Sequence, residues 1–303
     1  MNMPENRSLG ILLMLATMMC FVSLDAIMKY SLQTYSLVQV TWARFFFATV
    51  FAVLMCGKRL PRLAISHVPK LQLSRSILLM ITTCLFNAGL MFLPLATATT
   101  IMFLSPILIT ILSIFFLGEH VGIRRWLGIA VGFVGAVIVV QPWHLGTAAF
   151  NSGVVFFLAA ALTNANYQII TRKVRGDDPM TSLLYTAAGG AVFASLLLPF
   201  HWQWPDKMGW MLLVGSGFAG ALGHMCLIQA MRRAEASVVA PFAYSSLVWA
   251  TLLGYLIWKE LPGLNVLGGA LLIVSAGLYI FLRERVKKNG DVGQFLSPVH
   301  DKS

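Results

Sequence analysis

The sequence predicts an all-α integral membrane protein with ten transmembrane helices, arranged as two inverted repeats of five helices each. Three observations support this fold class. The 303 residues have a mean hydropathy of +0.79, and 58% are hydrophobic while only 11% are charged. The apolar residues fall into ten runs of about 20 residues, which is the length of a helix that crosses a bilayer. One of these runs recurs later in the chain with matching polar residues.

The ten runs follow one another with short connections rich in Pro and Gly, such as GKRLP, VQPWHLG and KELPG. Lipid offers no hydrogen-bond partners, so each span must satisfy its own backbone groups as a helix. The first run lacks a small-x-small cleavage site, and we expect it to be retained as a span. The spans are expected at 9–30, 36–57, 75–95, 97–117, 124–141, 152–172, 179–200, 208–231, 236–258 and 263–283.

The distribution of Lys and Arg predicts which way the spans point, because cytoplasmic connections carry most of the positive charge. With a cytoplasmic N-terminus, 18 Lys and Arg residues flank the inner ends of the spans. Only Lys29, Lys207 and Lys259 flank the outer ends, and Arg44 lies within a span. We therefore expect a multi-pass protein of the inner (cytoplasmic) membrane with both termini in the cytoplasm.

The same division predicts the organisation of the chain. A cytoplasmic tail at 1–8 precedes a first five-helix repeat at 9–141. A second five-helix repeat at 152–284 is followed by a cytoplasmic tail at 285–303.

Composition also argues against several classes of protein. The net charge is +11, but the basic residues lie in short connections and form no patch interleaved with aromatic residues, so no nucleic acid partner is expected. The four cysteines, Cys20, Cys56, Cys84 and Cys226, lie in or beside apolar runs without the spacing of metal ligands. No metal and no cofactor are therefore expected.

An intramembrane enzyme is the rival class, and the sequence does not favour it. Ser216 and His224 are the best candidates for a nucleophile and a base. They lie eight residues apart on one expected helix, about 12 Å along its axis, whereas such a pair must come within about 3 Å. The stretch GSGFAG at 215–220 matches a dinucleotide fingerprint but lies within a span and follows no strand.

The internal repeat is visible where 104–128 aligns without gaps on 245–269, at an offset of 141 residues. A glutamate ends the span in both copies, Glu119 in the first and Glu260 in the second, and glycines follow it at the same distances. Each half holds five spans, and this odd number makes the second half enter the membrane from the opposite side. Inverted repeats of this kind are typical of secondary transporters, whose substrate site lies near the midplane between the halves.

A family resemblance follows from the stretches DAIMKYSL and WARFFFA in the first two spans, SPILITILSIFFLGE in the fourth and ASVVAPFAYSSLVWATLLGYLIWKE in the ninth. With the repeat, they resemble the EamA-type permeases of the drug/metabolite transporter superfamily, over 9–284. The resemblance implies alternating-access transport of small organic metabolites, such as amino acids, their metal-chelating derivatives or nucleobases, and it favours export. It leaves open an importer of a vitamin or S-adenosylmethionine-like metabolite, and a lipid-carrier flippase. CFVSLD replaces the Trp-Gly pair common in the family's first span.

Polar residues at mid-span depth are candidates to bind a small-molecule substrate. At about 1.5 Å of rise per residue, the two asparagines Asn87 and Asn164 lie near the midplane. Amide groups and aromatic faces suit an amphipathic organic solute, although hydrogen bonds between helices are the alternative role of such residues. The candidate substrate-binding residues are Arg44, Asn87, Ser105, Asn164, Tyr167, Tyr244, Ser246 and Trp249.

Charge in the first span is costly in lipid and therefore indicates a function or a partner. Asp25 and Lys29 are four residues apart, so they share a helix face and can pair. Arg44 approaches from the neighbouring span. Three roles stay open: an ion pair or outer gate, binding of a substrate carboxylate by Arg44 or Lys29, and proton coupling through Asp25.

Four further residues are expected to have structural roles. Glu119 and Glu260 end their spans at opposite faces of the membrane, where they can bind neighbouring groups. Pro106 and Pro241 lie inside spans and should loosen the helices there. The expected partners are thus a small-molecule substrate, the lipid bilayer and, as a candidate coupling ion, the proton. The sequence predicts no particular oligomeric state.

Overall fold

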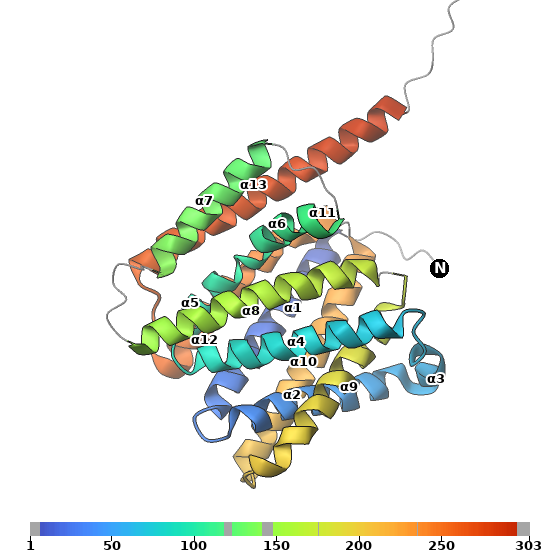
Figure 1. The fold of residues 1–303 in the computed structure, drawn as a ribbon, viewed down its shortest axis with the longest axis vertical. Coiled ribbons are helices and arrows are strands. Elements are labelled where there is room, and N and C mark those ends of the chain that lie inside the picture. Colours follow the sequence, from blue (N-terminus) through green and yellow to red (C-terminus); the bar gives the residue numbers. More distant parts are fainter. Residues whose placement is uncertain (1–6, 118–122, 141–147, 175, 235, 296–303) are drawn as a thin grey trace, which may run out of the picture.

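The protein is helical throughout the part of the chain that the computed structural model describes, residues 7–117, 123–140, 148–174, 176–234 and 236–295, and no strand occurs there. All ten expected spans are present, and the predicted fold class is confirmed. In chain order the spans are α1 (Arg7–Ser31), α2 (Leu37–Cys56), α4 (Pro69–Leu90), α5 (Leu95–Met102) with α6 (Ser105–Leu117), α7 (Ile123–Val140), α8 (Ala148–Lys173), α9 (Pro179–Leu197), α10 (Lys207–Arg233), α11 (Ala236–Val239) with α12 (Ser246–Trp258), and α13 (Leu264–Phe295) (Figure 1).

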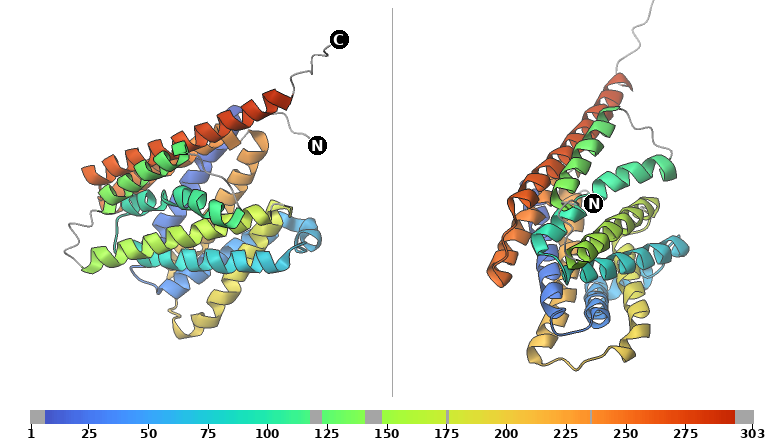
Figure 2. Two further views of the ribbon diagram at one scale, coloured as in Figure 1. Left: turned by 45° about the horizontal axis from the view of Figure 1, so that its top comes forward. Right: turned by 60° about the vertical axis from the view of Figure 1, so that its left-hand side comes forward.

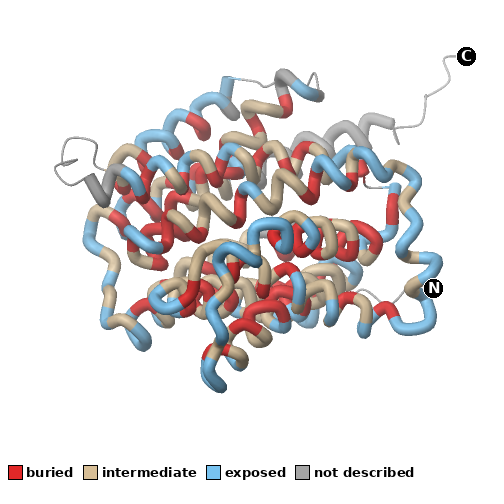
Figure 3. The backbone as a smooth tube through the Cα atoms, turned by 60° about the horizontal axis from the view of Figure 1, so that its bottom comes forward, coloured by how far each residue is buried: buried red, intermediate tan, exposed pale blue. Residues whose placement is uncertain are grey.

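Within the described residues, eight candidate spans are long and apolar enough to cross a membrane, and shorter apolar stretches lie in α7 and α13. Single helices carry both buried and exposed residues along their length (Figure 3). Large apolar side chains lie exposed, such as Phe133, Val155 and Val192, each 63% exposed. Such a surface suits lipid rather than water.

The fourth and ninth spans are both interrupted, at corresponding positions of the two repeats. In the fourth span α5 ends at Met102 and α6 begins at Ser105. In the ninth span a 3-10 segment, η4 (Ala240–Ser245), separates α11 from α12, which begins at Ser246. Pro106 lies in the first turn of α6 and Pro241 in that of η4, positions where a missing backbone N–H is tolerated. The interruptions therefore lie at the two prolines, and the loosening effect of the prolines stays a prediction.

Helices of the first repeat pack against helices of the second (Figures 1 and 2). The pairs are α1 with α10, α2 with α9 and α10, α4 with α8, and α7 with α13. Small residues allow the closest of these contacts. A Cβ atom on Gly217 of α10 would lie 2.7 Å from the backbone nitrogen of Ala48 in α2. The repeats thus form one body with its interior between them.

Candidate functional site

A cavity of about 650 Å³ lies between the two repeats and is lined by residues of α1, α2, α4, α5, α8, α9, α10 and α12. It reaches from Thr99 and Ser246, at the interrupted spans, to Asp177 and Pro179, at the junction of α8 and α9. Because every wall comes from a different span, the cavity exists only in the assembled fold.

Two opposite charges face this cavity from neighbouring helices. Asp25 comes from α1 and Arg44 from α2. They interact electrostatically but lie further apart than the 4.0 Å of an ion pair. Arg44 donates a hydrogen bond of 3.0 Å from Nη1 to Oγ1 of Thr83, whereas Asp25 makes no hydrogen bond with any residue that the structure describes. The charges are therefore available to a ligand.

Aromatic side chains complete the apolar part of the lining. Phe21, Phe86, Phe103 and Tyr167 all contribute to the wall. His224 of α10 also faces the cavity and packs edge-on against Phe21, with ring centroids 5.0 Å apart. The site thus combines two charges with several ring faces, which suits a ligand that has both charged groups and a flat apolar part.

Arg75 organises the end of the cavity near the junction of α8 and α9. It lies on α4 and is only 7% exposed. Its Nε donates to Oγ1 of Thr171 over 2.8 Å and its Nη2 to the Tyr167 hydroxyl over 2.7 Å, both on α8. Its Nη1 donates to the Ser182 carbonyl of α9 over 3.0 Å and to Oε1 of Gln72 over 3.3 Å. One guanidinium therefore ties three helices together.

Asp177 continues this network outside the membrane-spanning segments. Its Oδ2 accepts hydrogen bonds from Nε2 of Gln72, over 2.9 Å, and from the Ser66 hydroxyl. Its Oδ1 accepts from the backbone N–H of His67 over 3.1 Å. Burial by itself would raise the pKa of the Asp177 carboxyl, but these hydrogen bonds favour the charged form, and the net pKa is lowered.

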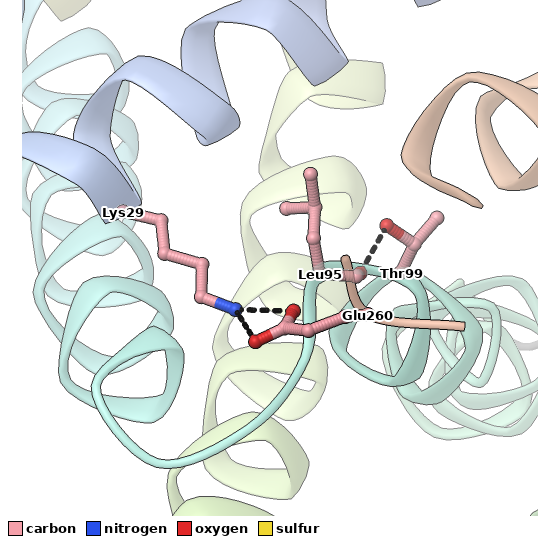
Figure 4. A network of polar contacts seen from close by, with 4 residues as sticks. All are labelled: Lys29, Leu95, Thr99 and Glu260. Carbon is pink, nitrogen blue, oxygen red and sulfur yellow. Dashed lines mark hydrogen bonds and ion pairs between the residues drawn. The ribbon is translucent and has the colours of Figure 1, made fainter. Parts of the chain in front are cut away.

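At the opposite end of the bundle, an ion pair joins the two repeats (Figure 4). Nζ of Lys29, near the end of α1, lies 2.7 and 2.9 Å from the carboxylate oxygens of Glu260, which follows α12. The same Nζ lies 4.6 Å from the ring centroid of Trp258. The pairing of Lys29 with Asp25 that their spacing allows is not the one that forms. Asp25 lines the cavity, and Lys29 binds a residue 231 positions away.

The comparison with known proteins decides the family. The chain matches the EamA-like transporter family over residues 8–141 and 151–282. It belongs to this family. Family and relatives indicate a small-molecule transporter of the drug/metabolite transporter superfamily rather than an enzyme, as the sequence predicts. The boundaries expected for the two repeats stay predictions.

The curated relatives of this EamA-like transporter are named for different substrates. An S-adenosylmethionine uptake transporter of Rickettsia bellii is 31% identical over 93% of this chain and 96% of its own. A riboflavin transporter of Vibrio cholerae is 29% identical over 91% and 94%. A pseudopaline exporter of Pseudomonas aeruginosa is 24% identical over 88% and 94%. A solved crystal structure with 20% identity matches 92% of this chain at a TM-score of 0.65, which supports the fold alone.

Four of the eight predicted substrate-binding residues of this EamA-like transporter line the cavity. They are Arg44, Asn164, Tyr167 and Ser246. The other four, Asn87, Ser105, Tyr244 and Trp249, lie outside the cavity lining.

These four residues are packed within the bundle instead. Nδ2 of Asn87 donates to Oγ1 of Thr41 over 3.0 Å and so joins α4 to α2. The ring of Tyr244 packs edge-on against Phe103, with centroids 5.2 Å apart. Ser105 is 4% exposed, and Trp249 packs against the central apolar cluster. Depth along a helix was predictable from the sequence, but the direction of each side chain was not.

Of the remaining residues, Glu119 lies outside the described residues, while Glu260 forms the ion pair with Lys29. Sequence reasoning missed Arg75, which it counts among the topological charges of the inner end. It also missed the cavity positions of Thr83 and His224. A guanidinium at the start of an apolar span was the available signal for Arg75. In the described chain, no group of three or more His, Cys, Asp or Glu residues could hold a metal ion.

Proposed function

We propose that this EamA-like transporter moves small zwitterionic metabolites derived from amino acids, by alternating access through the cavity between its repeats. The observation that carries the proposal is the pair Asp25 and Arg44. A carboxylate and a guanidinium face the same cavity, and neither is neutralised by a close ion pair. A zwitterionic substrate can pair with both charges at once. These two contacts would offset the free-energy cost of removing the substrate's charges from water.

In the proposed complex, the substrate carboxylate accepts hydrogen bonds from Arg44, and a substrate ammonium or sulfonium group lies against Asp25. The apolar part of the substrate packs between Phe21, Phe86 and Phe103, which line the same space. The cavity of about 650 Å³ has room for such a molecule with some water.

S-adenosylmethionine is the substrate to test first, since it combines a zwitterion, a sulfonium and a flat ring system. The Rickettsia bellii relative named for its uptake supports this choice and supports uptake as the direction. Export, which the family resemblance favours, is the alternative outcome of the same assay. Riboflavin is the second candidate, because it fits the aromatic lining and is named for the Vibrio cholerae relative, but it offers no zwitterion to the two charges.

The proposal also includes location and coupling. The inner membrane with both termini cytoplasmic follows from the distribution of Lys and Arg. The proton is the candidate coupling ion, and Asp25 its carrier. Asp25 lines the same cavity as Arg44 and His224 and makes no hydrogen bond with the described residues. An imposed pH gradient should change the flux of the wild type and leave the flux of Asp25→Asn unaffected. Equal indifference of both proteins would remove the proton from the mechanism.

The decisive experiment measures uptake of labelled S-adenosylmethionine into proteoliposomes, with competition by decarboxylated S-adenosylmethionine and by riboflavin. Arg44→Ala should weaken the apparent affinity by about 100-fold, since removing one partner of a buried charged contact costs about 2–5 kcal/mol. The variant should also lose the preference for the carboxylated substrate. Unchanged affinity and preference in Arg44→Ala would contradict the proposed role of the guanidinium.

A matched pair of variants on α8 controls for general damage. Asn164 lines the cavity, whereas Asn166 donates a hydrogen bond to the Leu162 carbonyl of its own helix. Asn164→Ala should reduce uptake and Asn166→Ala should not. Equal effects of the two substitutions would show that uptake does not depend on the cavity wall. Recovery of chemically altered label would favour an enzyme.

A further inference from the structure

A second cavity, of about 1090 Å³, lies at one end of the bundle. Its walls are the end of α2, the start of α9, the end of α10 and the connection that carries η1 (Gly57–Arg59) and α3 (Leu60–Leu63). We call it the basic pocket. It meets the transport cavity only at Asp177 and Ile228, which line both. The distribution of Lys and Arg predicts that this end faces the cytoplasm.

Four cationic side chains line the basic pocket. Lys58, Arg59 and Arg62 come from the first repeat and Arg232 from the second. All four are exposed, and none forms a hydrogen bond or ion pair with another residue in the described ranges. Their charges are therefore available to a ligand.

The two carboxylates in the same pocket, Asp177 and Asp178, form no ion pair with these cations. Asp177 accepts hydrogen bonds from Ser66, Gln72 and the His67 backbone. Asp178 caps α9, accepting from the Met180 backbone N–H over 2.8 Å. Four cations against two carboxylates leave the pocket with a net charge of +2, and this excess positive charge favours an anion from outside the chain.

Apolar side chains stand directly beside the cations. Met55, Leu63 and Ile65 line the pocket, and Ile65 is 71% exposed. A soluble anion gains nothing from contact with these apolar side chains. A phospholipid can use both parts of the pocket, because it has a phosphate and acyl chains in one molecule. Basic pockets at the cytoplasmic ends of transmembrane helices suit anionic lipid headgroups in this way.

We propose that the basic pocket binds the phosphate headgroup of an anionic phospholipid of the cytoplasmic leaflet. The lipid would bridge the connection after α2 to Arg232 at the end of α10, and so link the two repeats beside the inner end of the transport cavity. The proposal does not depend on which metabolite is transported.

The test compares lipid binding by the full-length protein in detergent, using thermal stability and native mass spectrometry. The probes are phosphatidylglycerol, phosphatidylcholine and inorganic phosphate. Phosphatidylglycerol should raise the melting temperature and stay bound, while the other two should do neither. In the double variant R62Q/R232Q its apparent affinity should fall by about thirtyfold, since each basic residue near a membrane surface contributes about a fivefold factor.

The control variant is K70Q/K173Q, which removes two exposed cations from the same end of the bundle but outside the pocket. It should bind phosphatidylglycerol like the wild type. Equal loss of affinity in both double variants would refute binding at the pocket and indicate diffuse electrostatic attraction. Equal binding of phosphatidylcholine would refute the requirement for an anionic headgroup. An equal response to inorganic phosphate would refute a lipid as the ligand. If R62Q/R232Q melts early without lipid, the single variants R62Q and R232Q, each with an expected fivefold loss, replace it.

Discussion

The ion pair of Lys29 with Glu260 should hold the outer end of the transport cavity closed, and Glu260→Gln should open it. The substitution keeps the side-chain size and leaves the Lys29 ammonium without its counter-ion. The two side chains are 10% and 32% exposed. The ion pair is therefore intermediate between a surface pair, which is worth about 0–1 kcal/mol, and a buried pair, whose disruption costs about 3–5 kcal/mol. A loss of about 2 kcal/mol would shift the balance toward an open outer end by about 30-fold.

Accessibility of the cavity from outside measures this shift. In a background with the four native cysteines replaced, Thr99→Cys places one thiol in the cavity wall. A membrane-impermeant maleimide, added outside cells, should label this thiol about 30-fold faster in Glu260→Gln than in the parent, if the open state is the reactive one.

Two further variants test the reasoning. Lys259→Gln removes the neighbouring charge, which lies over the Tyr255 ring, and should leave the labelling rate unchanged. The exchange of Lys29→Glu with Glu260→Lys should return the rate toward that of the parent. The gate is refuted if Glu260→Gln labels at the parental rate, or if Lys259→Gln accelerates labelling as much.

The remaining predictions concern stability in detergent, measured by thermal unfolding. Gly217→Ala should destabilise by about 1–3 kcal/mol, because the new methyl group meets the backbone of α2. Gly215→Ala on the same helix meets no atom closer than 3.9 Å and should be near neutral. Asp177→Asn should cost about 1–3 kcal/mol, since the amide can no longer accept all three hydrogen bonds. The folded-state pKa of Asp177 is lowered, so its contribution should be complete above the unfolded pKa of about 3.9 and lost as the pH falls through the folded value. The Asn variant should lack this part of the acid sensitivity. Arg75→Lys keeps the charge but cannot reproduce the contacts with α8 and α9, and should lower the melting temperature. Equal melting of each variant and its reference would contradict the corresponding contact.

Some features of this protein were predictable because they depend on the chain in one dimension. A helix that crosses a bilayer needs about 20 apolar residues. Whether a segment meets this requirement depends only on the residues of that segment. The ten spans follow from this requirement. The interruptions of two spans were predictable from Pro106 and Pro241, because proline weakens helix bonding locally. The glutamate pair at an offset of 141 residues exposed the repeat without any structure.

The cavity, in contrast, depends on the rotation of each helix about its axis. Asn87 and Asn164 lie at similar expected depths, yet Asn87 bonds to Thr41 on α2 while Asn164 faces the cavity. A span that is apolar on all sides carries little periodic signal, because lipid and protein neighbours are both apolar. Only packing against other helices selects the face that turns inward.

The sequence by itself thus determined that the chain crosses the membrane ten times as two inverted halves, since hydropathy and charge act on each segment separately. The tertiary structure alone decided which polar groups meet. Lys29 binds the carboxylate of Glu260, 231 residues away, rather than that of Asp25, four residues away. Arg75 lines the cavity, although its place in the sequence marks it only as a positive charge at the inner end of a span. Contacts between distant segments arise from the joint packing of all helices, and no local property of the chain encodes them.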